Sequence, residues 1–260
     1  MVEHGDRRAH LRDVPAADPV DPPIVLVPGI DGTALLFYRQ LPTLAERFDV
    51  VAFPLPSTEG RPSTMTTLVD DLATLVEEVS DDGAILCGES FGGALSMLTA
   101  LERPDLVRGL VIVNSFPRID RRATLWAAPK LLRLLPWGAM PLVRRYTSAH
   151  LHSPHTHQED LDEFHRRARH IDREGYIRRL EILRDFDITD RLTEIRAPTL
   201  LLAGDLDRLV PSVENGRIMN REIPDSELVV LRGYGHVCLI DHDLRLLDHV
   251  EPWWERVGAR

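Results

Sequence analysis

The chain has 260 residues, enough for one large domain or for a domain with a long insertion. Its net charge of −10 argues against a general role in nucleic-acid binding, and the lack of any run of 18 or more apolar residues predicts no transmembrane segment. The polar first twelve residues lack the apolar core of a secretory signal, so the sequence predicts a cytoplasmic protein.

Four prolines in residues 1–23 predict a loose N-terminal arm. Beyond this arm, short apolar segments alternate with helical patterns, which predicts an α/β fold with a doubly wound, mostly parallel sheet. Most of the apolar segments are continuous, as expected for strands that are buried on both faces. The predicted strands cover residues 24–27, 50–53, 84–87, 110–114, 199–203 and 227–231, and the predicted helices among them cover residues 64–79, 92–102, 212–222 and 241–257.

The pentapeptide GESFG, residues 88–92, joins the third predicted strand to the helix that follows it. A strand, a tight turn and a helix are the context that a G-x-S-x-G nucleophile elbow requires. Glycine at both ends lets the strand and helix approach closely, so the turn can present the Ser90 hydroxyl above the sheet. The sequence therefore predicts Ser90 as a nucleophile. We expect Glu89 to be buried or half-buried and to pair with a neighbouring side chain.

The connection between the fourth and fifth predicted strands is too long for a single crossover. It contains helical patterns at residues 123–135, 141–146, 158–171 and 174–186. We predict that residues 117–196 form a helical cap, inserted into a core that consists of residues 24–116 and 197–260. A cap over the strand ends would exclude water and shape a substrate pocket.

Residues 125–137 of this insertion, LWAAPKLLRLLPW, are apolar with basic residues between. Three interpretations stay open: packing of the cap on the core, a tunnel for an acyl chain, or docking on lipid or on an acidic carrier protein. If the segment lines a pocket, the predicted substrate-binding residues are Trp126, Leu131, Leu132 and Leu135. Residues 118–145 hold seven basic residues against one acidic residue, which favours either an anionic partner or a solvated basic face.

Residue types that often bind metals also occur here, but they do not predict a metal site. His150, His152, His155 and His157 lie close together in the insertion, without the spacing of a known metal motif, so we expect a solvated surface loop. The two cysteines, Cys87 and Cys238, lie in apolar stretches, and we expect them to be buried thiols that act as small hydrophobic residues.

An acid and a histidine follow the last two predicted strands. Because the carboxyl ends of parallel strands gather at one edge of a sheet, these residues should lie close to Ser90. His236 is the predicted base, and a carboxylate must hold its imidazole in the correct tautomer. Asp207 is the predicted acid, and Asp205 is its rival. Asn114, after the fourth strand, is uncharged and cannot serve as this acid.

The segments 27–33, 88–92, 204–211 and 235–236, together with the chain order Ser, Asp, His, resemble the α/β-hydrolase superfamily over residues 24–257. That superfamily commonly has His-Gly after its first core strand, whereas Pro28 stands in place of the histidine here. The hexapeptide PGIDGT, residues 28–33, is similar to that of the hydrolase part of phytyl ester synthase-like proteins. The resemblance implies an oxyanion hole formed by the backbone N–H groups of Ile30 and Phe91. Because the histidine that often braces this turn is missing, we expect Asp31 or Thr33 to brace it instead.

These residues predict a serine hydrolase that cleaves carboxylic esters of apolar acyl groups through an acyl-enzyme intermediate. The expected substrate is a small-molecule ester, and the chemistry implies no metal or organic cofactor. One alternative is a thioesterase or acyltransferase that uses the same triad on acyl groups of coenzyme A or of a carrier protein. Another is a small-ligand receptor built on a hydrolase pocket, since a fold does not by itself determine function.

Overall fold

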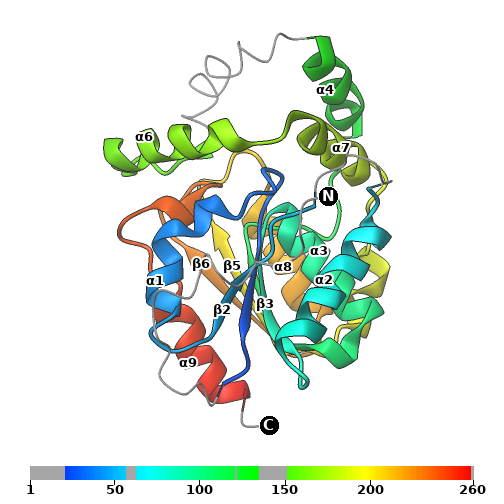
Figure 1. Cartoon of the computed structure of the whole chain (residues 1–260), viewed down its shortest axis with the longest axis vertical. Helices are drawn as coiled ribbons and strands as arrows, with labels where there is room; N and C mark the ends of the chain where they lie inside the picture. The colour runs from blue at the N-terminus through cyan, green and yellow to red at the C-terminus, as the bar shows by residue number, and fades with distance from the viewer. Residues whose placement is uncertain (1–20, 57–62, 121, 135–150, 259–260) are drawn as a thin grey trace.

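The computed structural model describes residues 21–56, 63–120, 122–134 and 151–258 (Figure 1). Six strands form one sheet in the order β2-β1-β3-β4-β5-β6, and every neighbouring pair is parallel. The prediction of a mostly parallel sheet is therefore confirmed, and most of the predicted arm, residues 1–20, lies outside the described residues. The strands are β1 (Ile24–Val27), β2 (Val50–Ala52), β3 (Ala84–Glu89), β4 (Val107–Val113), β5 (Thr199–Gly204) and β6 (Ser226–Leu231).

Helices cover both faces of the sheet, as a doubly wound fold requires (Figure 1). One face carries α2 (Met65–Val79), α3 (Phe91–Glu102) and α8 (Ser212–Glu222). The other carries α1 (Gln40–Leu44) and α9 (Leu247–Val257). Side chains alternate between the two faces along each strand, so that Leu86 joins one buried cluster and Cys87 the other. Because both clusters are apolar, successive residues of these strands are apolar and the strand sequences form continuous apolar runs.

The sequence did not predict α1 or the 3-10 helix η1 (Leu35–Arg39) that precedes it. Each has five residues, which is shorter than the window in which helical periodicity can be recognised. The predicted helix at residues 241–257 was too long, because α9 begins only at Leu247. Buried Gln40 accounts for the difference: its amide donates to the carbonyl oxygens of Leu239 (2.7 Å) and Leu244 (2.9 Å) and accepts from the N–H of Leu246 (2.9 Å). These bonds support a non-helical path before α9.

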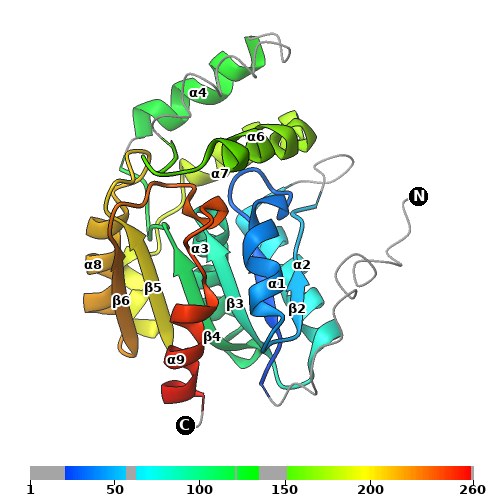
Figure 2. The ribbon, with the colours of Figure 1, turned by 90° about the vertical axis from the view of Figure 1, so that its left-hand side faces the viewer.

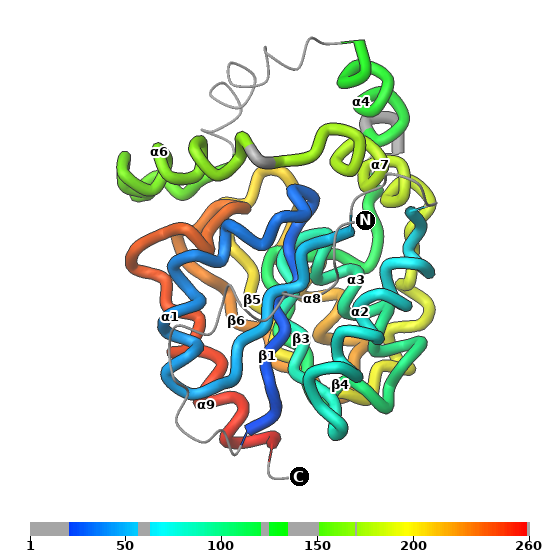
Figure 3. The backbone as a smooth tube through the Cα atoms, in the orientation of Figure 1, coloured from blue at the N-terminus to red at the C-terminus, as the bar shows by residue number. Residues whose placement is uncertain are grey.

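The long connection between β4 and β5 lies above the carboxyl ends of the strands (Figures 1 and 2). It contains α4 (Arg122–Leu134), α6 (Gln158–Arg167), the 3-10 helix η4 (Ala168–His170) and α7 (Arg173–Leu183), which we call the inserted helices. The tube in Figure 3 follows the chain from β4 to these helices and back to β5. The predicted helix at residues 141–146 lies outside the described residues. Within the described part of the chain, no helix is long and apolar enough to cross a membrane.

Candidate active site

Ser90 occupies a strained turn between β3 and α3. Its backbone has φ 53° and ψ −114°, a region that residues with side chains rarely adopt. A Cβ atom on Gly92 would lie 2.1 Å from the carbonyl oxygen of Val27, and one on Gly88 would lie 2.4 Å from the carbonyl oxygen of Gly92. Larger residues at these positions would push the strand and helix apart, which is the steric reason for glycine that the pentapeptide pattern suggested.

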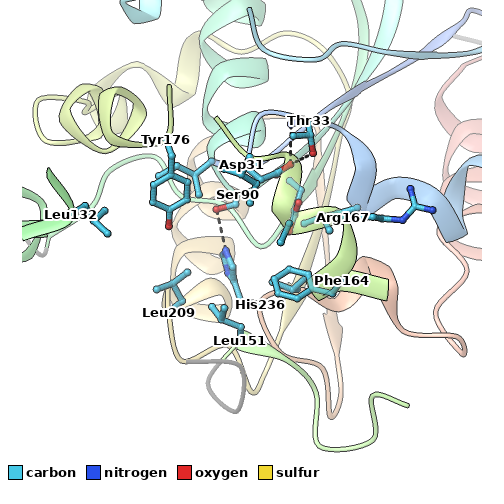
Figure 4. A pocket seen from close by; sticks show the side chains of 17 residues that line it. Asp31, Thr33, Ser90, Leu132, Leu151, Phe164, Arg167, Tyr176, Leu209 and His236 are labelled. Carbon is cyan, nitrogen blue, oxygen red and sulfur yellow. Dashed lines mark hydrogen bonds between the residues drawn. The ribbon is translucent and has the colours of Figure 1, made fainter. Parts of the chain in front are cut away.

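Three side chains that follow three different strands meet at this turn. The Nε2 atom of His236 lies 3.1 Å from Ser90 Oγ, the contact drawn as a dashed line in Figure 4, and its Nδ1 atom lies 2.6 Å from Asp207 Oδ2. A carboxylate can only accept hydrogen bonds, so Nδ1 carries the proton and Nε2 is left free to accept one from Ser90. The structure thus brings together the predicted nucleophile, base and acid in the geometry that proton transfer from a serine requires.

The geometry also shows which of the two acids, Asp207 or Asp205, contacts His236. Besides His236, the Asp207 carboxylate accepts hydrogen bonds from the N–H groups of Leu209 (2.9 Å) and Val210 (3.0 Å) and from Ser212 Oγ (2.5 Å). Its side chain is fully buried. Asp205 instead accepts a hydrogen bond from the N–H of Gly233 at 2.7 Å, in the turn after β6. Asp207 is therefore the residue that contacts the histidine.

Electrostatics within this group favours a charged acid and a basic imidazole. Burial alone raises the pKa of Asp207, but the hydrogen bond from His236, its positive charge when protonated and the Ser212 bond outweigh burial and hold the pKa below its ordinary value. Burial alone lowers the pKa of His236, whereas the hydrogen bond and charge of Asp207, with a smaller contribution from Glu89, raise the pKa above its ordinary value. Asp207 is then ionised at neutral pH, as the orienting role predicted for it would require.

Glu89 is buried, with 3% of its surface exposed. Burial raises its pKa to about 7, and attraction to His236 opposes that rise. The expectation of burial is confirmed. Its partner differs from the prediction, because the carboxylate accepts a hydrogen bond from the backbone N–H of Gly29. Every residue except proline has a backbone N–H group, so the sequence does not show which one a buried carboxylate will bind.

We expect the Glu89→Gln variant to lower the pKa of His236, because the neutral amide no longer stabilises the imidazolium. The base form of His236 would then be present at lower pH. In a profile of kcat/KM against pH, the midpoint of the rising limb should move to lower pH. The Glu77→Gln variant, at a largely exposed position on α2, should leave the midpoint in place. An unchanged midpoint in both variants would contradict the coupling between Glu89 and His236.

The turn at residues 28–33 is braced by both of the side chains that the sequence suggested. The N–H and the hydroxyl of Thr33 donate to Asp31 Oδ2 at 2.9 Å and 2.5 Å, and the N–H of Gly32 donates to the carbonyl oxygen of Gly29 at 3.0 Å. Ile30, in the middle of the turn, lines the same cavity as Ser90. Phe91 is the first residue of α3, so its N–H has no partner inside the helix. Of the two predicted oxyanion-hole residues, Ile30 thus lines the cavity of Ser90 and Phe91 follows Ser90 directly in the chain.

Two residues that sequence reasoning did not assign to the site help to hold it together. The Nδ2 atom of Asn114 donates to the carbonyl oxygens of Gly235 (3.0 Å) and His236 (2.8 Å), while its Oδ1 accepts from the N–H of Gly204 (2.7 Å). Asn114 thereby ties the end of β4 to the loops that carry the acid and the histidine. Arg179 on α7 donates to the carbonyl oxygens of Ile30 (2.8 Å) and Asp31 (3.2 Å). Their sequence positions gave no signal of these long-range contacts.

Two cavities meet at Ser90. The first, of about 220 Å³, includes His236 among its lining residues, together with Leu36, Leu132, Leu151, Phe164 and Ile171. The second, of about 260 Å³, does not include His236 and is lined among others by Phe116, Leu125, Ala128, Leu180 and Leu183. Ile30, Ser90, Tyr176 and Leu209 line both cavities. The inserted helices supply walls to each, so two largely apolar spaces open on either side of one hydroxyl.

The predicted substrate-binding residues on α4 are only partly placed at these cavities. Leu132 lines the first cavity. Trp126 and Leu131 are 58% and 59% exposed and line neither cavity, so their prediction is corrected. Helical periodicity is the reason: Leu125, Ala128 and Leu132 share the face of α4 that turns toward the cavities, and the other two residues lie off that face. Leu135 lies outside the described residues.

The histidines of the insertion do not all lie on the surface. His152 is buried and packs edge-on against Phe164, with ring centroids 4.6 Å apart, and burial lowers its pKa to about 4. The expectation of a solvated loop is therefore wrong for His152. His155 and His157 are exposed, and His150 lies outside the described residues.

One group of side chains has the composition of a metal site. Atoms of His157, Asp160 and His242 lie within 4.8 Å of one another. The two rings stack with centroids 3.6 Å apart and planes 23° apart, so their nitrogen lone pairs run side by side rather than converging on one ion. Asp160 already accepts hydrogen bonds from Tyr38 (2.9 Å) and Arg39 (2.6 Å). This geometry fits ring stacking and an ion pair better than metal ligation.

Both cysteines are buried free thiols, as predicted. Burial raises the pKa of Cys87 to about 12 and that of Cys238 well above its ordinary value, so both stay protonated at neutral pH. Neither thiol is therefore a candidate nucleophile beside Ser90.

Comparisons with known proteins agree with this fold. A family model described as "alpha/beta hydrolase fold" matches residues 22–243. A relative from Serratia proteamaculans (strain 568), named "Putative carbamate hydrolase RutD", is 28% identical over 242 residues, which cover 88% of this chain and 90% of the relative.

Two solved structures have a similar fold. MenH from S. aureus superposes with a TM-score of 0.81 at 16% identity, covering 94% of this chain and 97% of that one. A thermophilic esterase from Thermogutta terrifontis superposes with a TM-score of 0.81 at 22% identity, covering 92% and 91%. At these identities the likeness shows the shared fold alone.

Proposed function

This chain belongs to the α/β-hydrolase family, and we propose that it is a serine hydrolase that cleaves carboxylic esters of apolar acyl groups. The contact between Ser90 and His236, with Asp207 behind the histidine, is the observation that carries the proposal. Because this contact sits where two largely apolar cavities meet, it favours a substrate with an apolar group on each side of the reacting carbonyl.

The proposed reaction passes through an acyl-enzyme. Ser90 Oγ attacks the ester carbonyl while His236 Nε2 takes its proton, and the N–H groups of Ile30 and Phe91 stabilise the negative oxygen that forms. His236 then gives the proton to the leaving oxygen, and the alcohol departs as the acyl group stays on Ser90. Water, activated by the same histidine, attacks the acyl-enzyme and releases the carboxylic acid. Asp207 stabilises the imidazolium in both steps.

The position of His236 supports one assignment of the two cavities to the two parts of the ester. The leaving oxygen must come within reach of His236 Nε2 to receive its proton, and His236 lines only the first cavity. The alcohol part of the ester would therefore occupy the first cavity, and the acyl chain the second. The inserted helices would then act as a cap that sets the preference for both the acyl chain and the alcohol part of the ester.

We expect one bulky substitution in each cavity to change one preference only. Ala128→Trp narrows the second cavity and should shift preference toward shorter acyl chains, with no change for alcohols. Ile171→Trp narrows the first cavity and should shift preference toward smaller alcohol groups, with no change for acyl chains. The discrimination per methylene should be about 10- to 200-fold in kcat/KM, measured on esters of graded length on each side. Leu131→Trp, at an exposed position, is the matched control. If Ala128→Trp changes the alcohol preference and Ile171→Trp the acyl preference, the alcohol part occupies the second cavity and the acyl chain the first.

A second candidate reaction is hydrolysis of a carbamate. It is favoured by the relative from Serratia proteamaculans, whose name assigns it to carbamates. A carbamate presents a carbonyl to the same nucleophile and oxyanion hole, so the proposed triad is compatible with both. The largely apolar cavities favour an ester with hydrocarbon groups.

The remaining alternatives are a thioesterase or acyltransferase and a ligand receptor. An anionic acyl carrier would need unpaired cations near the site. Among the described cations of the basic segment, Arg133 pairs with Glu181 at 2.8 Å, Arg118 pairs with Asp120 at 3.0 Å, and Lys130 lies over the ring of Trp126. These pairings favour a structural role for the three residues.

One substrate panel tests the proposal against all of these alternatives. It compares p-nitrophenyl esters of graded acyl length, matched p-nitrophenyl carbamates and acyl-CoA thioesters. Ester hydrolysis with many turnovers and the highest kcat/KM on apolar acyl groups is the expected result. A preference for carbamates or thioesters would replace the ester assignment, and turnover that stops after one cycle would favour a receptor.

A further inference from the structure

A buried arginine reaches from an inserted helix to the turn that carries Ile30. Arg179 lies on α7 and is 4% exposed. Its Nε atom donates to the carbonyl oxygen of Ile30 at 2.8 Å, and its Nη2 atom donates to that of Asp31 at 3.2 Å. Two neighbouring carbonyl groups of one turn are thus held by one rigid guanidinium, which the flexible ammonium of a lysine would not reproduce.

The turn and the helix are shaped to admit this group. A Cβ atom on Gly32 would lie 2.8 Å from the central carbon of the guanidinium, and one on Gly175 would lie 2.9 Å from its Nη1 atom. Gly32 also has φ 75°, a conformation that favours glycine. Burial lowers the pKa of Arg179, and the carboxylates of Asp31 and Asp172 offset part of that effect. A fitted slot with partial charge compensation distinguishes this residue from an arginine that only solvates the surface.

The contacts of the turn fix the direction of one backbone N–H group. The N–H of Ile30 belongs to the same peptide group as the carbonyl of Gly29, which accepts a hydrogen bond from Gly32 inside the turn. In a trans peptide these two groups point in opposite directions, so the N–H of Ile30 points away from that bond. The peptide before it is held by Glu89 through the N–H of Gly29, and the peptide after it is held by Arg179.

We propose that Arg179 is a positioning residue for the oxyanion hole, holding the N–H of Ile30 in the orientation that stabilises the negative oxygen on a substrate bound to Ser90. The inference rests on the proposed function. It adds that the hole depends on α7: a donor from the core is aligned by a side chain from the insertion. Catalysis is then coupled to the docking of the inserted helices, because a displaced α7 would release the Ile30 turn.

Arg179→Met tests this inference, since it keeps most of the side-chain volume and removes both donors. Complete loss of an oxyanion-hole donor lowers kcat by about 10²- to 10³-fold, so a misaligned donor should lower kcat by about 10- to 100-fold with KM nearly unchanged. Arg178→Met is the matched control. Arg178 is the preceding residue on α7, is partly exposed, and donates to the carbonyl oxygen of Ser63 at 2.9 Å, away from the turn.

A second measurement separates positioning from a general loss of structure. A boronic acid that places an oxygen in the oxyanion hole should bind the Arg179→Met variant more weakly by about the same factor as kcat, whereas a product carboxylic acid should bind with unchanged affinity. Millimolar guanidinium should restore part of the activity of Arg179→Ala. If the methionine variant does not fold, Arg179→Lys carries the same measurements, with a smaller loss expected.

The outcomes distinguish this inference from the proposed function. Wild-type protein that neither hydrolyses esters nor reacts with a fluorophosphonate would overturn the proposed function. Reactive wild type, with an Arg179→Met variant whose kcat and boronic-acid affinity match those of Arg178→Met, would overturn the positioning role alone. A variant with a lower melting temperature but unchanged kcat would show that Arg179 only stabilises the fold.

Discussion

The Ser90→Ala variant is expected to lose about 10⁴- to 10⁶-fold in kcat, because the acyl-enzyme has no other nucleophile to form on. Only the stabilisation of the oxyanion by backbone donors would remain. The folded state should persist, since the variant removes a single oxygen from a turn whose backbone is held by contacts from β4, α3 and Ser115. The rate should be measured on the best p-nitrophenyl ester, with melting temperature as the check on folding.

Covalent labelling gives a direct form of the same test. A fluorophosphonate should add to Ser90 in the wild-type protein, as identified by peptide mass spectrometry, and should not label the alanine variant. Ser80→Ala, at the end of α2, is the control and should keep both activity and labelling. Labelling of another residue in active protein, or full activity of Ser90→Ala, would exclude Ser90 as the nucleophile.

The Asp207→Asn variant should lose about four orders of magnitude in kcat. An amide at this position presents an NH₂ group to His236 Nδ1, which favours the tautomer with the proton on Nε2. That tautomer cannot accept the proton of Ser90. The hydrogen bond and charge of Asp207 also raise the pKa of His236, so their loss should move the rising limb of the residual pH profile to lower pH.

Asp205→Asn is the matched comparison, two residues away on the same loop. An asparagine oxygen can still accept the N–H of Gly233, so kcat should change little. A small loss of stability is the expected effect, and it can be followed by urea denaturation. If Asp205→Asn has the larger effect on kcat and Asp207→Asn is mild, Asp205 is the acid and the contact between His236 and Asp207 is not the productive one.

The choice between Asp205 and Asp207 could not be made from the local sequence pattern. Both follow β5 and differ by two positions, so hydrophobic periodicity places them equally well at the carboxyl edge of the sheet. The decision comes from the path of the loop: the N–H groups of Leu209 and Val210 and the hydroxyl of Ser212 gather around Asp207 and aim it at His236. Those three partners lie within five residues of Asp207, but the histidine lies 29 positions away on the loop after β6, and no short window of sequence shows which of the two acids it meets.

The same distinction applies across the molecule. Local sequence patterns predicted the order of strands and helices, the elbow around Ser90 and the chain order Ser, Asp, His. Each depends on residues close together in the chain: apolar runs form strands that are buried on both faces, and glycines occur where two backbones touch. Sequence alone therefore determined the fold class and the residues that the sheet would bring to one edge.

Tertiary structure decided what depends on contacts between distant segments. Gln40 ends the predicted last helix early by bonding backbone groups some 200 positions away, and Asn114 and Arg179 support the site across about 90 to 150 positions. The side of α4 that faces the cavities was likewise fixed by its packing on α7 and not by composition, which is why Leu132 reaches a cavity and Trp126 does not. A polar side chain bonded to a remote carbonyl has the same local sequence as one exposed to water, so only the folded chain distinguishes the two.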